Sequence, residues 1–264
     1  MKITVKILIG LTLLVAIACY KTQKRPNNTI AGHGTQEMHW SYSGETSPVH
    51  WAEIEKNSDC NGNHQSPINI IHNDVDSVRI NNDLKILYTP STLLSKVENN
   101  GHSIQFDFEP GDSINYKGKT FYLKQIHFHE PSEHRINGMI YPIEMHLVHV
   151  SKRGEITVLG VLGEEGKESQ LFEFFESFLP LENGAVKDIH QKIDLSGLFL
   201  EDKHYYSYGG SLTTPPCSEN VNWIVFKEPI ILSVEEVLKL KNNMPLNNYR
   251  NEQALNGRIV NYHY

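Results

Sequence analysis

The chain has few cysteines, no basic cluster and no long apolar run. Its 24 lysines and arginines face 31 aspartates and glutamates, for a net charge of −7, which argues against nucleic-acid binding. The apolar run Ile7–Ala18 is too short for a normal transmembrane helix. Residues 38–260 contain no internal repeat and no long low-complexity stretch. The chain after residue 18 is long enough for one substantial core, so we expect a single globular domain at 38–264.

The N-terminal segment predicts export. Residues 1–18 combine a basic start, an apolar run and a small-x-small pattern before Cys19, which is typical of a signal peptide. Cys19 also fits lipid attachment, so two alternatives stay open: a lipid anchor in the cell envelope, or cleavage into the periplasm or medium. Residues 19–37 are polar and contain proline and glycine, which predicts a flexible tether.

Three histidines carry the strongest functional signal. His127 and His129 alternate within an apolar and aromatic segment typical of a strand, so both side chains point to one face. His146 comes after enough chain for a loop and a returning antiparallel strand. Three neutral imidazoles can hold Zn²⁺ and leave its fourth tetrahedral position to water. A structural site would be closed by a fourth ligand, often cysteine, and none lies nearby, so the pattern predicts a catalytic site.

Any of the 14 histidines in this chain could be an ordinary surface or core residue. The surroundings of these three favour a metal site instead. Gln125 and Glu144 each lie two residues before a candidate ligand, on the same strand face. They could accept the second ring N–H, as partners of metal-bound histidines usually do. Glu133 lies close by in the sequence, and a threonine-rich turn comes later at 212–216.

Several blocks of this sequence resemble the signature blocks of the α-class carbonic anhydrases, in the same order and with similar spacing. The resemblance covers roughly Met38 to Val260 and departs at Glu130-Pro131, where many animal members have Trp-Gly. The blocks are His127-Phe128-His129, Ser132-Glu133-His134, Glu144 to His149, Leu212 to Pro216, Gln65 to Ile70, Asn99 to His102 and Asn222-Trp223.

The resemblance implies a lyase that reversibly hydrates carbon dioxide to bicarbonate and a proton through a zinc-bound hydroxide. In carbonic anhydrase, zinc lowers the pKa of its bound water from about 15.7 to about 7, a value carried over here by resemblance. Thr213 would accept the hydroxide's hydrogen bond and donate its own proton to Glu133, because an ionised carboxylate only accepts. His102 matches the proton shuttle, and the ordinary histidine pKa near 6.5 suits that task.

The resemblance also implies a cavity with an apolar and a polar side. Ordinary core packing is the alternative for each apolar position. The residues matching the wall of the carbon dioxide pocket are Val148, Val158, Leu212, Thr214, Val221 and Trp223, and those matching the polar, water-holding side are Tyr42, Asn99 and Gln105.

Cys60 and Cys217 match positions that form an intradomain disulfide in many extracellular members of the family. An even number of cysteines after Cys19 agrees with an oxidising compartment. Since Cys217 comes directly after Pro216, the bond would also brace the Thr213 loop.

The fold implied by the resemblance is mainly β, with short helices beside one large, mostly antiparallel twisted sheet. Cis peptides are expected at Ser66-Pro67 and Pro215-Pro216. The sequence pattern predicts strands at 83–88, 103–108, 121–128, 143–150, 155–162 and 223–226, and helices at 169–178 and 233–241.

Other histidines receive no metal role. His149 has the opposite strand parity to His146, so we expect it and His134 to be buried, hydrogen-bonded residues. Two other functions compete with carbon dioxide hydration: a catalytically dead binding domain and an ester hydrolase that uses the same site. Carbon dioxide and bicarbonate are the expected partners, and either a monomer or a dimer is compatible with the sequence. The histidines without a predicted role are His33, His39, His50, His64, His72, His190, His204 and His263.

Overall fold

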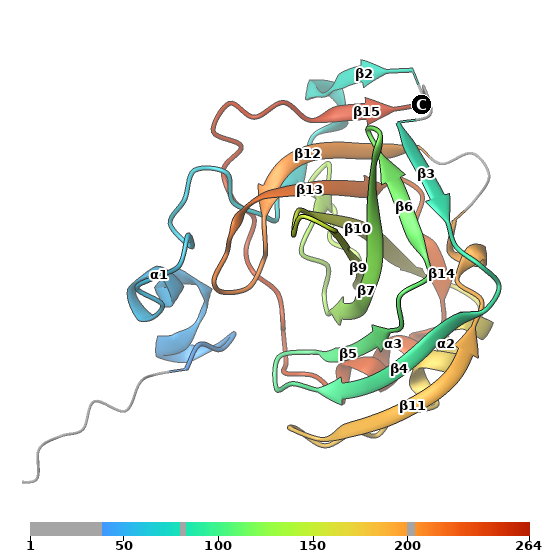
Figure 1. Ribbon diagram of the computed structural model, residues 1–264. Coiled ribbons are helices and arrows are strands. Elements are labelled where there is room, and N and C mark those ends of the chain that lie inside the picture. Colours follow the sequence, from blue (N-terminus) through green and yellow to red (C-terminus); the bar gives the residue numbers. More distant parts are fainter. Residues whose placement is uncertain (1–38, 80–82, 200–203) are drawn as a thin grey trace, which may run out of the picture. The chain divides into compact units, whose positions relative to one another are not determined.

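The computed structural model describes residues 39–79, 83–199 and 204–264 (Figure 1). The expected signal peptide at 1–18, the candidate lipid site Cys19 and the tether at 19–37 lie outside the described residues. In the part of the chain that is described, no helix is long and apolar enough to cross a membrane.

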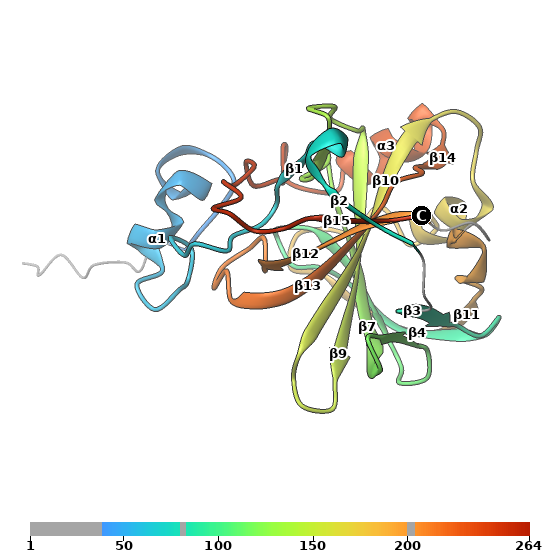
Figure 2. The same ribbon diagram turned by 90° about the horizontal axis from the view of Figure 1, so that it is seen from above.

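A large β-sheet dominates the fold, as expected from the resemblance. Among the described residues it has 13 strands, mostly antiparallel, with parallel pairs where β10 meets β13 and β14 and where β15 meets β2. Figure 2 shows the twist of the central strands from above. In sheet order, the main path is β11 (Val186–Ile193), β4 (Thr92–Asn99), β5 (Ile104–Phe108), β7 (Lys119–His129), β9 (Ile143–Ser151), β10 (Ile156–Glu165), β13 (Glu219–Phe226), β12 (Tyr205–Ser211), β15 (Asn261–His263) and β2 (Asp76–Val78).

The remaining elements are short. Strand β14 joins β10, β3 pairs with β6, β6 also pairs with β7, and β1 and β8 form a separate parallel pair. Their bounds, together with those of the helices and 3-10 turns, are β14 (Ile230–Leu232), β3 (Leu84–Leu87), β6 (Ser113–Tyr116), β1 (Asn69–Ile70), β8 (Arg135–Ile136), α1 (Trp51–Ile54), α2 (Gln170–Glu176), α3 (Val234–Lys241), η1 (Gly44–Thr46), η2 (Pro48–His50), η3 (His72–Asp74) and η4 (Ser196–Leu198).

Alternation along β7 and β9 separates the two faces of the sheet. On β7, Phe128 belongs to the main core cluster, whereas its neighbours His127 and His129 point to the opposite face. On β9, Met145 and Leu147 belong to the same cluster, and His146 lies between them in sequence. We call the side that carries Phe128, Met145 and Leu147 the helix face. The side that carries His127, His129 and His146 is the site face.

Helices α2 and α3 contribute to the core on the helix face. The Phe175 ring of α2 lies 4.7 Å from Phe106 and 5.5 Å from Phe128, measured between ring centroids. Helix α3 begins with a complete capping box, in which Ser233 and Glu236 satisfy each other's backbone N–H groups. Burial of these aromatic rings supports the strand that carries His127 and His129.

All six predicted strands and both predicted helices are confirmed, with ends shifted by a few residues. Three longer strands, β4, β11 and β12, were not predicted, and neither were the shorter β1, β2, β6, β8, β14 and β15. The eight residues of β11 are mostly exposed and polar on a sheet edge, so they lack the apolar alternation that indicates a strand. Ser66-Pro67 and Pro215-Pro216 are cis as expected, and Glu130-Pro131 and Leu179-Pro180 are cis as well.

The start of β7 is set by a tight hairpin from β6. Lys117 and Gly118 both have positive φ, 49° and 77°, which suits the two-residue turns that join antiparallel strands. Tyr116 then pairs with Lys119, which sets the register at the start of β7. A bulge between Leu123 and Gln125 then adds one residue to β7 opposite β9, so that Phe128 faces the core and His127 and His129 lie on the site face.

Candidate active site

The three predicted histidines converge on the site face. His127 on β7 lies directly opposite His146 on β9. The ring centroids are 5.0 Å apart for His127 and His129, 5.1 Å for His127 and His146, and 4.6 Å for His129 and His146. One ring nitrogen of each residue lies within 4.8 Å of the others. We call this group the histidine tripod.

Two of the tripod rings are oriented by the partners predicted for them. Nδ1 of His127 lies 2.8 Å from Oε1 of Gln125, and Nε2 of His146 lies 2.8 Å from Oε1 of Glu144. Because both oxygens accept, these ring nitrogens carry the protons. Nε2 of His127 and Nδ1 of His146 are therefore left with lone pairs toward the centre of the tripod.

The third ring is oriented by Asn248, a residue that no sequence pattern indicated. Nδ1 of His129 donates to the backbone oxygen of Asn248 at 2.6 Å, across a sequence separation of 119 residues. The buried Asn248 side chain donates to the carbonyls of His102 and Phe128 and accepts the N–H of Glu130. Because the acceptor is a backbone oxygen, the residue type at position 248 does not indicate it, and only the fold identifies it.

The chemistry of the tripod fits a zinc ion. Burial lowers the pKa of all three histidines, that of His129 to about 4, so the rings are neutral at neutral pH. Neutral imidazole is the form that binds metal. Nε2 of His129 is buried and has no hydrogen-bond partner among the described residues. Three nitrogen donors with an open side match a catalytic zinc site.

Glu144 connects the tripod to a buried network. Its Oε1 faces Nδ1 of His134 at 2.7 Å as well as His146, and its Oε2 accepts the backbone N–H groups of Glu133 and His134. Burial alone would raise the Glu144 pKa, but the hydrogen-bonded histidines His134 and His146 outweigh it and hold this pKa well below its usual value. Gly160 on β10 pairs with His146 on β9. It leaves room for the Glu144 carboxylate, since a Cβ at position 160 would lie 3.1 Å from Oε1 of Glu144.

Replacing Glu144 by glutamine is expected to weaken zinc binding by about 10- to 100-fold. The new NH₂ group would face two N–H donors, so the apo protein should also lose about 1–3 kcal/mol of unfolding free energy. Competition with a chromogenic chelator and denaturant titration measure the two effects. Glu155→Gln, on the surface beside Lys119, is the matched control. Unchanged zinc affinity in Glu144→Gln would refute this role.

Glu133 lies beside the tripod, and a backbone N–H group holds its carboxylate in place. Its Oε1 accepts the N–H of Arg250 at 2.8 Å. Burial raises its pKa to about 7, although the nearby His146 and Thr213 favour the ionised form. Its Oε2 is buried and has no hydrogen-bond partner among the described residues. Thr213 itself is buried. The structure therefore brings together the two residues that the resemblance paired.

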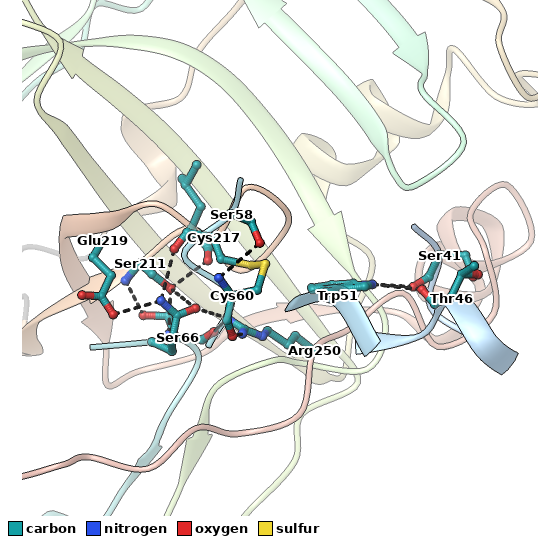
Figure 3. Close-up of a disulfide and its surroundings, with 12 residues drawn as sticks. Ser41, Thr46, Trp51, Ser58, Cys60, Ser66, Ser211, Cys217, Glu219 and Arg250 are labelled. Carbon is teal, nitrogen blue, oxygen red and sulfur yellow. Dashed lines mark hydrogen bonds between the residues drawn. A yellow bond between two sulfur atoms is a disulfide. The ribbon is translucent and has the colours of Figure 1, made fainter. Parts of the chain in front are cut away.

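The predicted disulfide between Cys60 and Cys217 is present, with a Cα–Cα distance of 4.8 Å (Figure 3). The N–H of Cys217 donates to the backbone oxygen of Thr214 at 2.8 Å, next to Thr213. The Arg250 guanidinium donates to the backbone oxygen of Cys60 at 2.8 Å. Arg250 thus contacts the disulfide through its side chain and Glu133 through its backbone.

The apolar residues matched to the wall of the carbon dioxide pocket lie close together on neighbouring strands. Val158 on β10 is paired with Val148 on β9 on one side and with Trp223 on β13 on the other. Val221 and Leu212 belong to the same hydrophobic cluster. Val158, Val221 and Trp223 are buried, while Val148, Leu212 and Thr214 are half-buried.

A sequence profile described as eukaryotic-type carbonic anhydrase matches residues 46–264. The chain belongs to this family. The carbonic anhydrase of Klebsiella pneumoniae is 41% identical over 84% of this chain and 90% of its own length, and that of Neisseria gonorrhoeae is 36% identical over 95% of each. The solved α-carbonic anhydrase of Thermovibrio ammonificans, in complex with the inhibitor sulfanilamide, is 43% identical with a TM-score of 0.80, over 84% of this chain and 98% of that one.

The polar side of this carbonic anhydrase differs in part from expectation. Gln105 lies opposite His127 and donates to Asp107, and the buried hydroxyl of Tyr42 has no partner among the described residues. Asn99, expected to hold ordered water in the cavity, is instead buried. Its Nδ2 donates to backbone oxygens of the 181 and 243 segments, and its Oδ1 accepts the N–H of Gly101, so this prediction was wrong. Asn99 positions the loop before His102.

Two histidines outside the tripod are structural, as expected. Nε2 of His134 contacts the hydroxyl of Tyr208 at 2.7 Å, and Nε2 of His149 contacts that of Tyr88 at 2.6 Å. Both histidines are fully buried. Neither takes part in the tripod.

The sequence departure of this carbonic anhydrase at Glu130-Pro131 has a local structural role. Glu130 is buried, and its Oε1 pairs with Nζ of Lys241 on α3 at 2.6 Å. Its backbone N–H donates to the side chain of Asn248. Glu130 therefore ties α3 to the segment that directly follows His129.

Proposed function

We propose that this protein catalyses the reversible, zinc-dependent hydration of carbon dioxide to bicarbonate and a proton. The observation that carries the proposal is the tripod, whose outer ring nitrogens are all held by acceptors so that its inner nitrogens converge. His127 and His129 would hold the metal through Nε2, and His146 through Nδ1. Zinc there would lower the pKa of a bound water to about 7 and so make it a nucleophile at neutral pH.

Thr213 and Glu133 would orient the nucleophile. The carboxylate of Glu133 is fixed by the Arg250 N–H at Oε1, and its buried Oε2 is free to accept the hydroxyl proton of the nearby Thr213. Thr213 then presents a lone pair to the cavity and accepts a hydrogen bond from the nucleophile. The raised pKa of Glu133 belongs to the protein without metal, and a positive charge at the tripod favours the ionised carboxylate that this step needs.

The apolar wall formed by Val148, Val158 and Trp223 would hold carbon dioxide, a small molecule without hydrogen-bond donors. His102, whose side chain is half-buried, would accept the proton released in each turnover. Ester hydrolysis would use the same residues with a larger substrate, which the apolar wall suits less well than carbon dioxide.

Stopped-flow hydration of carbon dioxide tests the proposal. We expect rapid hydration by the zinc-loaded protein, loss after chelation and recovery after zinc is restored, with near-UV circular dichroism to show that the fold survives. No hydration by a folded protein with one zinc per chain would overturn the proposal and favour a binding domain. Higher efficiency with an ester than with carbon dioxide would favour the hydrolase.

We also propose that the protein functions after export. The Cys60–Cys217 bond supports an oxidising compartment, which agrees with the signal peptide expected at residues 1–18. Lipid attachment at Cys19 and simple cleavage remain the two alternatives. The intact mass of the mature protein distinguishes them, because diacylglycerol and an acyl chain add mass to Cys19.

A further inference from the structure

A second histidine lies against the shuttle candidate. His39 is exposed, and its Nε2 is 3.1 Å from Nε2 of His102, a hydrogen bond between two imidazoles. The two ring centroids are 5.2 Å apart. His39 and His102 are separated by 63 positions, so no sequence pattern connects them, and the sequence gives His39 no role.

An aromatic cluster fixes this pair. The His102 ring stacks on Trp40, with centroids 3.6 Å apart and an interplanar angle of 14°. Trp40 in turn contacts Trp51 edge-to-face at 5.1 Å, and the Trp51 indole N–H donates to two backbone oxygens of the 41–46 segment. His102 is also held by Asn248, which donates to its backbone oxygen. The contact between His39 and His102 thus joins two well-supported segments.

We propose that His39 is the second member of a two-imidazole proton relay, which takes the proton from His102 and releases it to solvent. This inference rests on the proposed hydration of carbon dioxide. A proton that reaches Nδ1 of His102 lets the Nε2 proton of that ring pass to Nε2 of His39. The Nδ1 proton of His39 then leaves to water or buffer, so one proton enters and one leaves. Both rings end neutral with exchanged tautomers, and exchange with solvent resets them.

The surroundings favour this direction of transfer. Partial burial and the neighbouring charge of His39 lower the pKa of His102 to about 4. A proton on His102 is therefore unstable there, while the exposed His39 ring can carry the charge in contact with water. Two rings this close hold one proton far more readily than two, because two positive charges at 3.1 Å would repel each other.

The test compares four zinc-loaded variants of the full chain: His39→Gln, His39→Ala, His102→Ala and the control His50→Gln. Glutamine can keep a hydrogen bond to His102 but cannot carry the proton. His50 belongs to the same N-terminal segment and pairs with the exposed Glu53. Stopped-flow hydration is measured at low and at high imidazole buffer concentration, and the imidazole C–H resonances are followed by NMR across pH.

At low buffer, His39→Gln and His39→Ala should lower kcat on the order of tenfold. Their kcat/KM should stay unchanged, because the relay acts after carbon dioxide has reacted. Free imidazole should restore kcat, and the titration of His102 should move to higher pH once the His39 charge is gone. A low-buffer kcat of His39→Gln equal to that of wild type and His50→Gln, with His102→Ala impaired, would overturn the relay alone. Absence of hydration by the wild type would instead overturn the proposed function.

Discussion

Replacing Thr213 by valine is expected to lower kcat/KM for carbon dioxide hydration by about 10²- to 10³-fold, the usual effect of removing one preorganised hydrogen-bonding group. Valine keeps the shape of threonine in this buried position but has no hydroxyl. Glu133 loses a donor, and the nucleophile loses the acceptor that orients it. The contacts within the tripod do not change, so zinc should stay bound.

Stopped-flow rates, together with zinc content measured by atomic absorption, test this expectation. Thr213→Ser is the matched variant, because it keeps the hydroxyl and removes only a methyl group, and it should retain most of the activity. Thr213→Val with full zinc content and wild-type kcat/KM would show that orientation by Thr213 contributes nothing. Loss of zinc in Thr213→Val would point to a structural role instead.

Removal of the Cys60–Cys217 bond should have the largest effect on stability. The bond spans 157 residues, for which the chain-entropy model gives up to about 5 kcal/mol of unfolding free energy. Activity should fall as well, because Cys217 holds Thr214 through its N–H and Cys60 accepts from Arg250. We therefore expect stability and catalysis to depend on the same bond.

Denaturant titration and hydration rates, each with and without reducing agent, measure both effects. A Cys60→Ser/Cys217→Ser double variant is the control, since reducing agent should change neither quantity in that protein. Lower stability with unchanged activity would refute the bracing of the Thr213 loop. No change in either quantity would mean that the bond has no measurable role.

The tripod could be predicted because its geometry is mostly local. Alternation along one strand places His127 and His129 on one face, and the same rule places Gln125 and Glu144 beside their histidines. His149 could be assigned to the opposite face for the same reason. Only the pairing of β7 with β9 joins distant segments, and both strands have a strong apolar pattern.

The rest depends on contacts between distant residues. Asn248 orients His129 through a backbone oxygen, and Arg250 fixes Glu133 through a backbone N–H, neither of which a sequence pattern can reveal. The prediction for Asn99 was wrong because a polar residue type does not show whether its side chain forms hydrogen bonds with protein or with water. The pairing of His39 with His102 likewise depends on the packing of Trp40.

The separation of 119 residues between His129 and its acceptor Asn248 bears on how the enzyme is made. A growing chain contains all three tripod histidines long before it contains the residue that orients one of them. Metal affinity depends on such orienting partners. The tripod should therefore reach its full affinity for a metal only after the C-terminal segment has docked, so that metal binding would report that the chain has folded.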